Sequence, residues 1–120
     1  MDTLQAEVNT ALVATGYTIS YHYPQGGIVT PMVTYYESAN DVNTRADGAE
    51  ALTNVAYVVD IWADTPEATA TMALAIDTRL SALGLSRVFS IDLYEQDTSI
   101  HHKSMRYRGV IHIAEQKVYQ

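Results

Sequence analysis

The sequence predicts an α+β fold: one two-layer domain over residues 1–120, with a mainly antiparallel sheet of about five strands and two helices packed on one face. A chain of 120 residues with 48% hydrophobic and 18% charged residues has the size and composition of a single globular domain. Two segments carry apolar residues at helical spacing, and the remaining segments alternate apolar and polar residues as strands do. The order helix, strands, helix, hairpin is typical of this class.

A first helix is predicted over residues 2–16. Leu4, Val8 and Leu12 recur at helical spacing, although the apolar stripe that they form is narrow. Gly16 can end the helix because glycine readily adopts the left-handed conformation found at helix ends.

Strands are predicted over residues 17–23, 31–37 and 52–62, which are rich in tyrosine and β-branched residues. In the third of these strands, alternate residues from Val55 to Ile61 are expected to face the core. Residues 38–50 contain asparagine, aspartate, serine and glycine and almost no large apolar side chain. This composition predicts a long mobile loop.

The second helix is predicted to begin after Thr65, which can cap it, with Pro66 in the first turn and Glu67 near the positive end of the helix dipole. Its buried stripe runs from Met72 to about Leu83, and Gly84 follows its end.

Residues 88–94 and 101–113 then predict two strands of a long antiparallel hairpin.

The charge of the chain restricts the partners that it can bind. Seven lysine and arginine residues against fourteen aspartate and glutamate residues give a net charge of −7, which disfavours tight binding to a phosphate backbone. The one basic cluster contains Lys103, Arg106 and Arg108, with histidines around it. The absence of cysteine excludes disulfides, thiolate zinc sites and cysteine chemistry. We expect a soluble intracellular protein, because the sequence has neither a signal-peptide pattern nor a long apolar span.

The strongest candidate for a metal or acid–base site is the pair His101 and His102, with nearby acidic residues and a third histidine: Asp92, Glu95, Asp97 and His112. Neighbouring residues on a strand point to opposite faces, so this pair cannot converge on one ion. No nucleophile motif occurs either. We therefore expect no catalytic residues, no metal and no cofactor.

The aromatic composition favours a binding or assembly role. The chain has nine tyrosines and one tryptophan but only one phenylalanine, and tyrosine and tryptophan are enriched at protein interfaces. Asp60 interrupts an apolar strand; it could bond the backbone or Arg106, or form a salt bridge across a subunit joint. The residues expected at a subunit or partner interface are Asp47, Asp60, Trp62, Tyr94, Glu95, His101, His102, Lys103, Arg106 and Tyr107.

Several short motifs follow one another in a recognisable order. They are Tyr23-Pro24, the run from Pro31 to Glu37, Ala46-Asp47-Gly48, the run from Tyr57 to Trp62, Leu83-Gly84-Leu85, the run from Asp92 to Glu95, and the run from His102 to Tyr107. Taken together, this order resembles the tail-completion proteins of tailed bacteriophages over almost the whole chain. In particular it resembles the tail terminator, or tail-to-head joining, group from phages and prophages of Gram-positive bacteria.

The resemblance implies a structural virion protein of the tail, assembled in the cytoplasm of the bacterial host. Such a protein forms a ring, usually a hexamer, that caps the tail tube, ends its polymerisation and provides a docking surface for the head. The implied partners are other copies of the chain, the tail tube protein and a head completion or stopper protein, with DNA only passing through the lumen and no membrane. Two alternatives remain: another ring protein of the particle, either the tube subunit or a head–tail connector, and a small histidine-dependent metal-binding enzyme.

Overall fold

The computed structural model describes residues 3–22, 27–46, 49–95, 99–112 and 117–118. The elements in chain order are α1 (Thr3–Val13), β1 (Thr18–Tyr21), β2 (Met32–Ala46), β3 (Ala49–Ala63), α2 (Pro66–Ala82), β4 (Ser86–Glu95), β5 (Ile100–His112) and β6 (Lys117–Val118).

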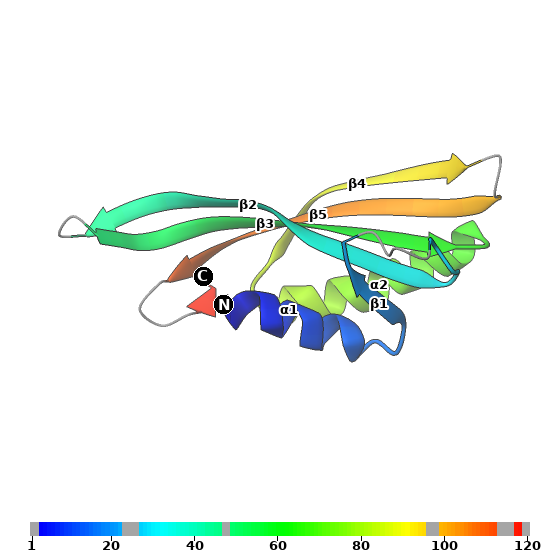
Figure 1. Cartoon of the computed structure of the whole chain (residues 1–120), viewed down its shortest axis with the longest axis horizontal. Coiled ribbons are helices and arrows are strands. Elements are labelled where there is room, and N and C mark those ends of the chain that lie inside the picture. The colour runs from blue at the N-terminus through cyan, green and yellow to red at the C-terminus, as the bar shows by residue number, and fades with distance from the viewer. Residues whose placement is uncertain (1–2, 23–26, 47–48, 96–98, 113–116, 119–120) are drawn as a thin grey trace.

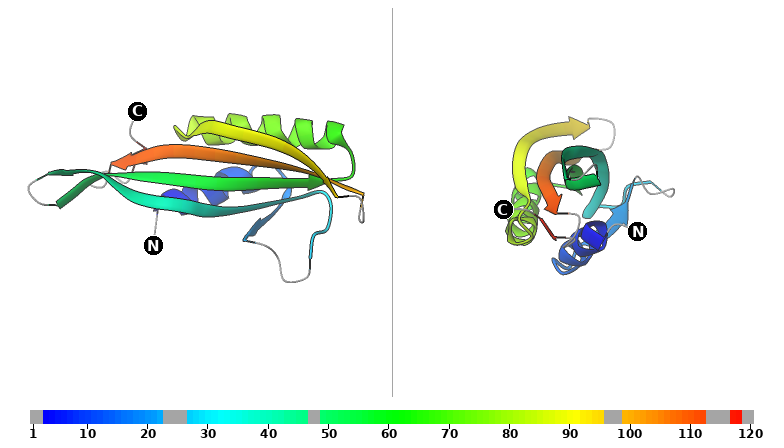
Figure 2. Two further views of the ribbon diagram at one scale, coloured as in Figure 1. Left: turned by 90° about the horizontal axis from the view of Figure 1, so that it is seen from above. Right: turned by 90° about the vertical axis from the view of Figure 1, so that its left-hand side faces the viewer.

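The strands form one sheet in the order β1-β2-β3-β5-β4, and the short β6 pairs with β5. Only β1 and β2 run parallel, so the prediction of a mainly antiparallel sheet is confirmed. Both helices lie on the same side of this sheet (Figure 1). The molecule is elongated, with extents of 54 × 24 × 22 Å, as the views along and across its long axis show (Figure 2). Neither helix is long and apolar enough to cross a membrane within the described residues.

The main core lies between the helices and the sheet. Leu4, Val8 and Leu12 of α1 are buried, as their helical spacing predicts. From α2 the core receives Met72, Ala73, Ile76 and Leu80. From the sheet it receives Val33, Tyr35, Val55, Tyr57, Val59, Ile61, Met105 and Tyr107. The predicted core face of β3 is therefore confirmed.

The central strand β3 is buried on its other face as well. Ala56, Val58 and Trp62 alternate with the core residues and are at most 7% exposed, although no helix covers this face among the described residues. The strand is paired on both sides, with β2 and with β5, so its neighbours shield it. We call this side of the sheet, which faces away from the helices, the outer face.

The prediction of a mobile loop over residues 38–50 is wrong for residues 38–46 and 49–50, and residues 47–48 lie outside the described residues. β2 continues to Ala46 and β3 begins at Ala49, and the pairing of the two extends outward through Asp41 with Asn54 and Ala46 with Ala49. The reason is that β3 pairs with β2 along most of this segment. This pairing satisfies backbone N–H and C=O groups even though the side chains have low strand propensity. Three register shifts between residues 37 and 45 accommodate the irregular sequence.

This hairpin extends beyond both helices (Figure 1). We call the part of it that follows the pairing of β2 with β1, residues 36–46 of β2 and 49–58 of β3, the arm. The outer end of the arm lies beyond the helices, whereas Val55 and Tyr57 at its base belong to the core.

The other elements follow the sequence prediction closely, with shifted ends. The first helix ends at Val13 and not at Gly16, which lies three residues further on with φ +88°. The first strand covers only Thr18–Tyr21. At the start of α2 the Thr65 hydroxyl accepts a hydrogen bond of 3.1 Å from the backbone N–H of Ala68, so the predicted cap is confirmed.

The packing of α2 gives a stability prediction. Ile76 is fully buried against the sheet, whereas Leu74 on the same helix is 72% exposed. Ile76→Ala should lower the free energy of unfolding by about 2–5 kcal/mol, because it removes buried methyl groups and leaves a cavity. Leu74→Ala is the matched control and should change it by less than about 0.5 kcal/mol. Urea unfolding of the two variants checks the difference, and equal effects would contradict the described packing of α2.

Candidate assembly surface

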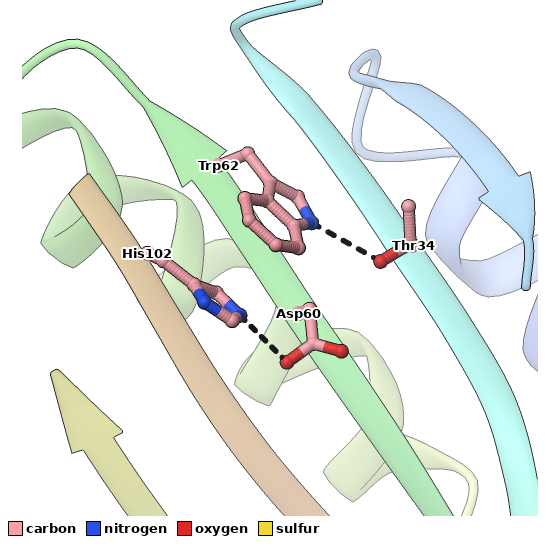
Figure 3. A network of polar contacts seen from close by, with 4 residues as sticks. All are labelled: Thr34, Asp60, Trp62 and His102. Carbon is pink, nitrogen blue, oxygen red and sulfur yellow. Dashed lines mark hydrogen bonds and ion pairs between the residues drawn. The ribbon is translucent and has the colours of Figure 1, made fainter. Parts of the chain in front are cut away.

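Strand register decides which of the candidate interface residues share a face. Trp62 of β3 pairs with His102 of β5, and Asp60 pairs with Ser104. Paired residues lie on the same face of a sheet, so Asp60, Trp62 and His102 all lie on the outer face. Figure 3 shows their side chains together with Thr34 of β2.

These four residues form a connected polar network across three strands. The His102 Nε2 atom lies 2.9 Å from the Asp60 Oδ1 atom, and the two side chains are 14% and 16% exposed. The Trp62 ring stacks on the His102 ring with centroids 3.8 Å apart and planes 11° from parallel. The Trp62 Nε1–H donates a hydrogen bond of 3.1 Å to the Thr34 hydroxyl, which is buried. The stacking and the two polar contacts orient the imidazole and the indole together.

The sequence does not predict the partner of Asp60. Arg106 is the one side chain that it suggests for this role, whereas in the structure the partner is His102. The contact is diagonal, because Asp60 faces Ser104 in the register and reaches the residue two positions before it. The alignment of two strands distant in sequence was the missing information, and no local pattern contains it.

The two adjacent histidines lie on opposite faces of β5, as strand geometry predicts. His101 pairs with Ala63 and Tyr94 on the helix side, with its ring centroid 4.8 Å from that of Tyr94. His102 lies on the outer face with Trp62. Within the described ranges, no group of three or more histidine, aspartate, glutamate or cysteine side chains is placed to hold a metal ion.

Two of the basic candidate residues lie on opposite faces of the β4–β5 pair. The Lys103 Nζ atom lies 2.6 Å from the Asp92 Oδ1 atom on the helix side, but Asp92 is 74% exposed, so this ion pair contributes little to stability. On the outer face the guanidinium carbon of Arg106 lies 5.9 Å from the ring centroid of Phe89. That distance permits a cation–π contact.

A hollow of about 620 Å³ lies on the outer face beside this arginine. Small residues of β2 and β3, namely Ser38, Ala39 and Ala56, line it on one side. On the other side it is lined by Val88, Phe89, Arg106 and Arg108. Within the part of the chain that the structure describes, neither arginine has an ion-pair partner. The hollow therefore presents two cations to an incoming group.

The edge strand β4 is exposed along its whole described length. All the described side chains from Ser86 to Tyr94 are exposed, including the large apolar ones. These are Val88, Phe89, Ile91, Leu93 and Tyr94, each 42–52% exposed. Apolar side chains gathered on one edge strand are typical of a surface that binds another protein.

Tyr107 occupies a different environment from the other candidates. It is fully buried, and its hydroxyl donates a hydrogen bond of 2.9 Å to the Asp77 Oδ1 atom of α2. Burial, and then the hydrogen bond to Asp77, raises the pKa of Tyr107 well above its ordinary value. This side chain joins the sheet to α2 and presents no surface to a partner.

Two candidates cannot be placed in the same way. Asp47 lies outside the described residues, and Glu95 is described only as a backbone position at the end of β4.

The network gives a prediction that the single tryptophan makes easy to measure. Thr34→Val removes the acceptor of the Trp62 indole N–H while keeping the shape of the side chain. The free energy of unfolding should fall by about 1 kcal/mol, and the Trp62 emission should shift. Thr18→Val, at an exposed strand position, is the control and should change neither quantity. Urea unfolding followed by tryptophan fluorescence tests this; an unchanged emission in Thr34→Val would show that the hydrogen bond is absent.

Comparison with known proteins identifies the family of this chain. No curated protein matches the sequence. The family model described as tail completion protein gp17 matches residues 3–112, which is nearly the whole chain and includes every strand of the sheet except β6. Proteins of this family are structural components of the bacteriophage tail, where they meet other tail or head proteins. The resemblance seen in the order of the sequence motifs is therefore confirmed, and the chain belongs to the tail completion protein gp17 family of bacteriophage origin.

Proposed function

We propose that this tail completion protein acts as a ring, with six copies as the expected number, that caps the tail tube and stops its polymerisation. Its other side then docks the head through a completion or stopper protein. The ring assembles in the cytoplasm of the host and remains in the virion tail. One observation carries the proposal: the chain belongs to this family, and its edge strand β4 has exposed apolar side chains that a second subunit could cover.

The open sheet supports a ring and not a closed pair of subunits. β1 and β4 lie at the two ends of the strand order, so the two edges of the sheet differ in sequence and length. A contact between two different surfaces of the same chain is heterologous, and repeated heterologous contacts close into rings when the rotation allows it. A subunit with two unlike edges is suited to such a contact.

The charged and aromatic residues of the β4–β5 hairpin are the proposed contact groups. His101 and Tyr94 lie together near one end of the hairpin, and the exposed Arg106 lies on its outer face. Charges at such a surface set the register and the choice of partner more than the strength of binding. Their role in this proposal is recognition between subunits and neighbouring rings, with no catalytic step and no cofactor.

The acidic character of the chain is compatible with DNA passing through the ring. The net charge of −7 makes attraction between the protein and the phosphate backbone weak. A lumen of this sign would repel the phosphates and let DNA slide through without binding.

Native mass spectrometry of the purified protein, alone and with the tail tube protein, tests the ring. Mass spectrometry should detect a species with six times the 13.2 kDa subunit mass. In the mixture with tube protein, electron microscopy should show this ring at one end of the tail tubes. A subunit that stays monomeric in both samples would reject the ring. Polymerisation of this chain into long tubes on its own would make it a tube subunit and not a terminator.

Shortening the arm tests its part in assembly. In the shortened variant, a two-residue Asn-Gly turn replaces the segment between Val42 and Thr53, which pair with each other. The change removes the tip of the hairpin but leaves the β2–β3 pairing beside the helices intact. The shortened protein should still unfold cooperatively and should no longer cap tails, because the removed part lies beyond the helices. Complementation of a phage that lacks this protein, followed by counting of normal-length tails joined to heads, provides the measurement. Normal tails from the shortened protein would show that the arm is dispensable.

A further inference from the structure

We infer that the arm of one subunit adds to the free edge of β4 of the next subunit, so that the sheet continues from copy to copy around the ring. This inference rests on the proposed ring and names the two surfaces that hold it together. The partner of the β4 edge is thus a second copy of the chain, and the segment of that copy that pairs with β4 is the part of β2 in its arm.

The first support is the free backbone edge of β4. This strand has ten residues and ends the strand order, with β5 on one side and no described strand on the other. A long, exposed and apolar edge offers unpaired N–H and C=O groups to another chain. Pairing by an added strand satisfies these groups and covers the exposed Phe89, Ile91 and Leu93.

The second support is a matching free edge on the opposite side of the same sheet. β1 pairs with β2 only from Met32 to Tyr35. From Tyr36 to Ala46, no described strand lies on that side of β2, and the free length is close to that of β4. The outer end of the arm also projects beyond both helices, so a neighbouring subunit can approach this part of the edge without meeting α1 or α2 (Figure 1).

The third support is the difference in charge between the two regions. β4 and β5 together contain four basic residues against two acidic ones, Asp92 and Glu95, and the excess lies on β5, where Arg106 and Arg108 line the hollow beside β4. In its sequence, the segment 36–50 has four acidic residues and one basic residue, and Asp41 is exposed on β2. Asp41 pairs with Asn54, which places it on the outer face, where the two arginines also lie. A strand added to β4 would bring this carboxylate toward the hollow.

Complementary charge also selects the arm over a second β4 as the added strand. Two β4 strands side by side would place two pairs of arginines, Arg106 and Arg108 on the β5 strand behind each β4, near the same interface, and like charges there are unfavourable. Such a pairing is moreover isologous and stops at a dimer, whereas pairing of β4 with β2 leaves one free edge at each end for the next copy.

Charge reversal tests the contact. The double variant Arg106→Glu with Arg108→Glu should raise at least tenfold the subunit concentration at which half of the protein is in rings. Adding Asp41→Arg should restore at least part of this loss. Arg79→Glu, the same kind of charge reversal made once at an exposed position on α2, is the control and should leave assembly unchanged. Native mass spectrometry over a dilution series measures assembly, and urea unfolding shows that each subunit is folded.

Cross-linking identifies the neighbours directly, and the absence of cysteine from the natural chain removes any background. Subunits with Ser90→Cys on β4 and subunits with Asn40→Cys on β2 are mixed, assembled and treated with a short bis-maleimide. Covalent dimers of the two different variants are expected. Thr78→Cys on α2 replaces Asn40→Cys in the control mixture and should give none.

The outcomes separate this inference from the proposed function. Rings that form with unchanged stability in the double arginine variant would overturn the inference and leave the ring proposal standing. Rings without the Ser90–Asn40 cross-link, or with cross-links between two Ser90→Cys subunits instead, would do the same. Absence of rings from the natural protein, with and without tube protein, would reject the proposed function itself.

Discussion

The continuous pairing of β3 with β2 on one side and β5 on the other is the interaction on which the rest of the structure depends. It runs from Leu52 to Ala63 on the β5 side and along nearly all of β3 on the β2 side. It places Tyr57 and Tyr107 side by side beneath the helices and brings Trp62 to His102 on the outer face. The helix core and the polar network are thus two faces of one ladder, and a shift of one residue in this register would exchange them.

Local sequence was sufficient for the parts of the fold that depend on periodicity. The alternation in β3, the Thr65 cap and the buried stripe of α2 are repeated patterns within one segment, and the structure has all three. The arm was mispredicted because its strands are held by a partner segment and not by their own side chains. The contact between Asp60 and His102 is similar, since the two residues are 42 positions apart and meet only through the register. Tyr107 was expected at an interface because of its residue type, yet its hydroxyl finds its acceptor inside the subunit.

The polar groups of the subunit fall into two kinds. Thr34, Asp60, Trp62 and His102 have their partners within the chain, and these contacts fix the relative positions of β2, β3 and β5. Arg106 and Arg108, by contrast, have no ion pair among the described residues and stand beside exposed apolar side chains. The outer face therefore combines a polar network within the subunit with arginines that are available to a neighbour. The network holds the strands in fixed positions, and a preorganised surface binds a partner at a lower entropic cost.

The position of both helices on one side of the sheet has a consequence for any assembly in which the sheet is continuous from one copy to the next. Such an assembly has two different surfaces: helices cover one of them, and the strands of the sheet form the other. Since every copy is related to the next by the same rotation, all the helices have the same orientation. Where the sheet runs parallel to the ring axis, they all face either the hole or the exterior. The bore is then lined by a single kind of secondary structure throughout, and its smoothness and charge are set by one face of one short chain.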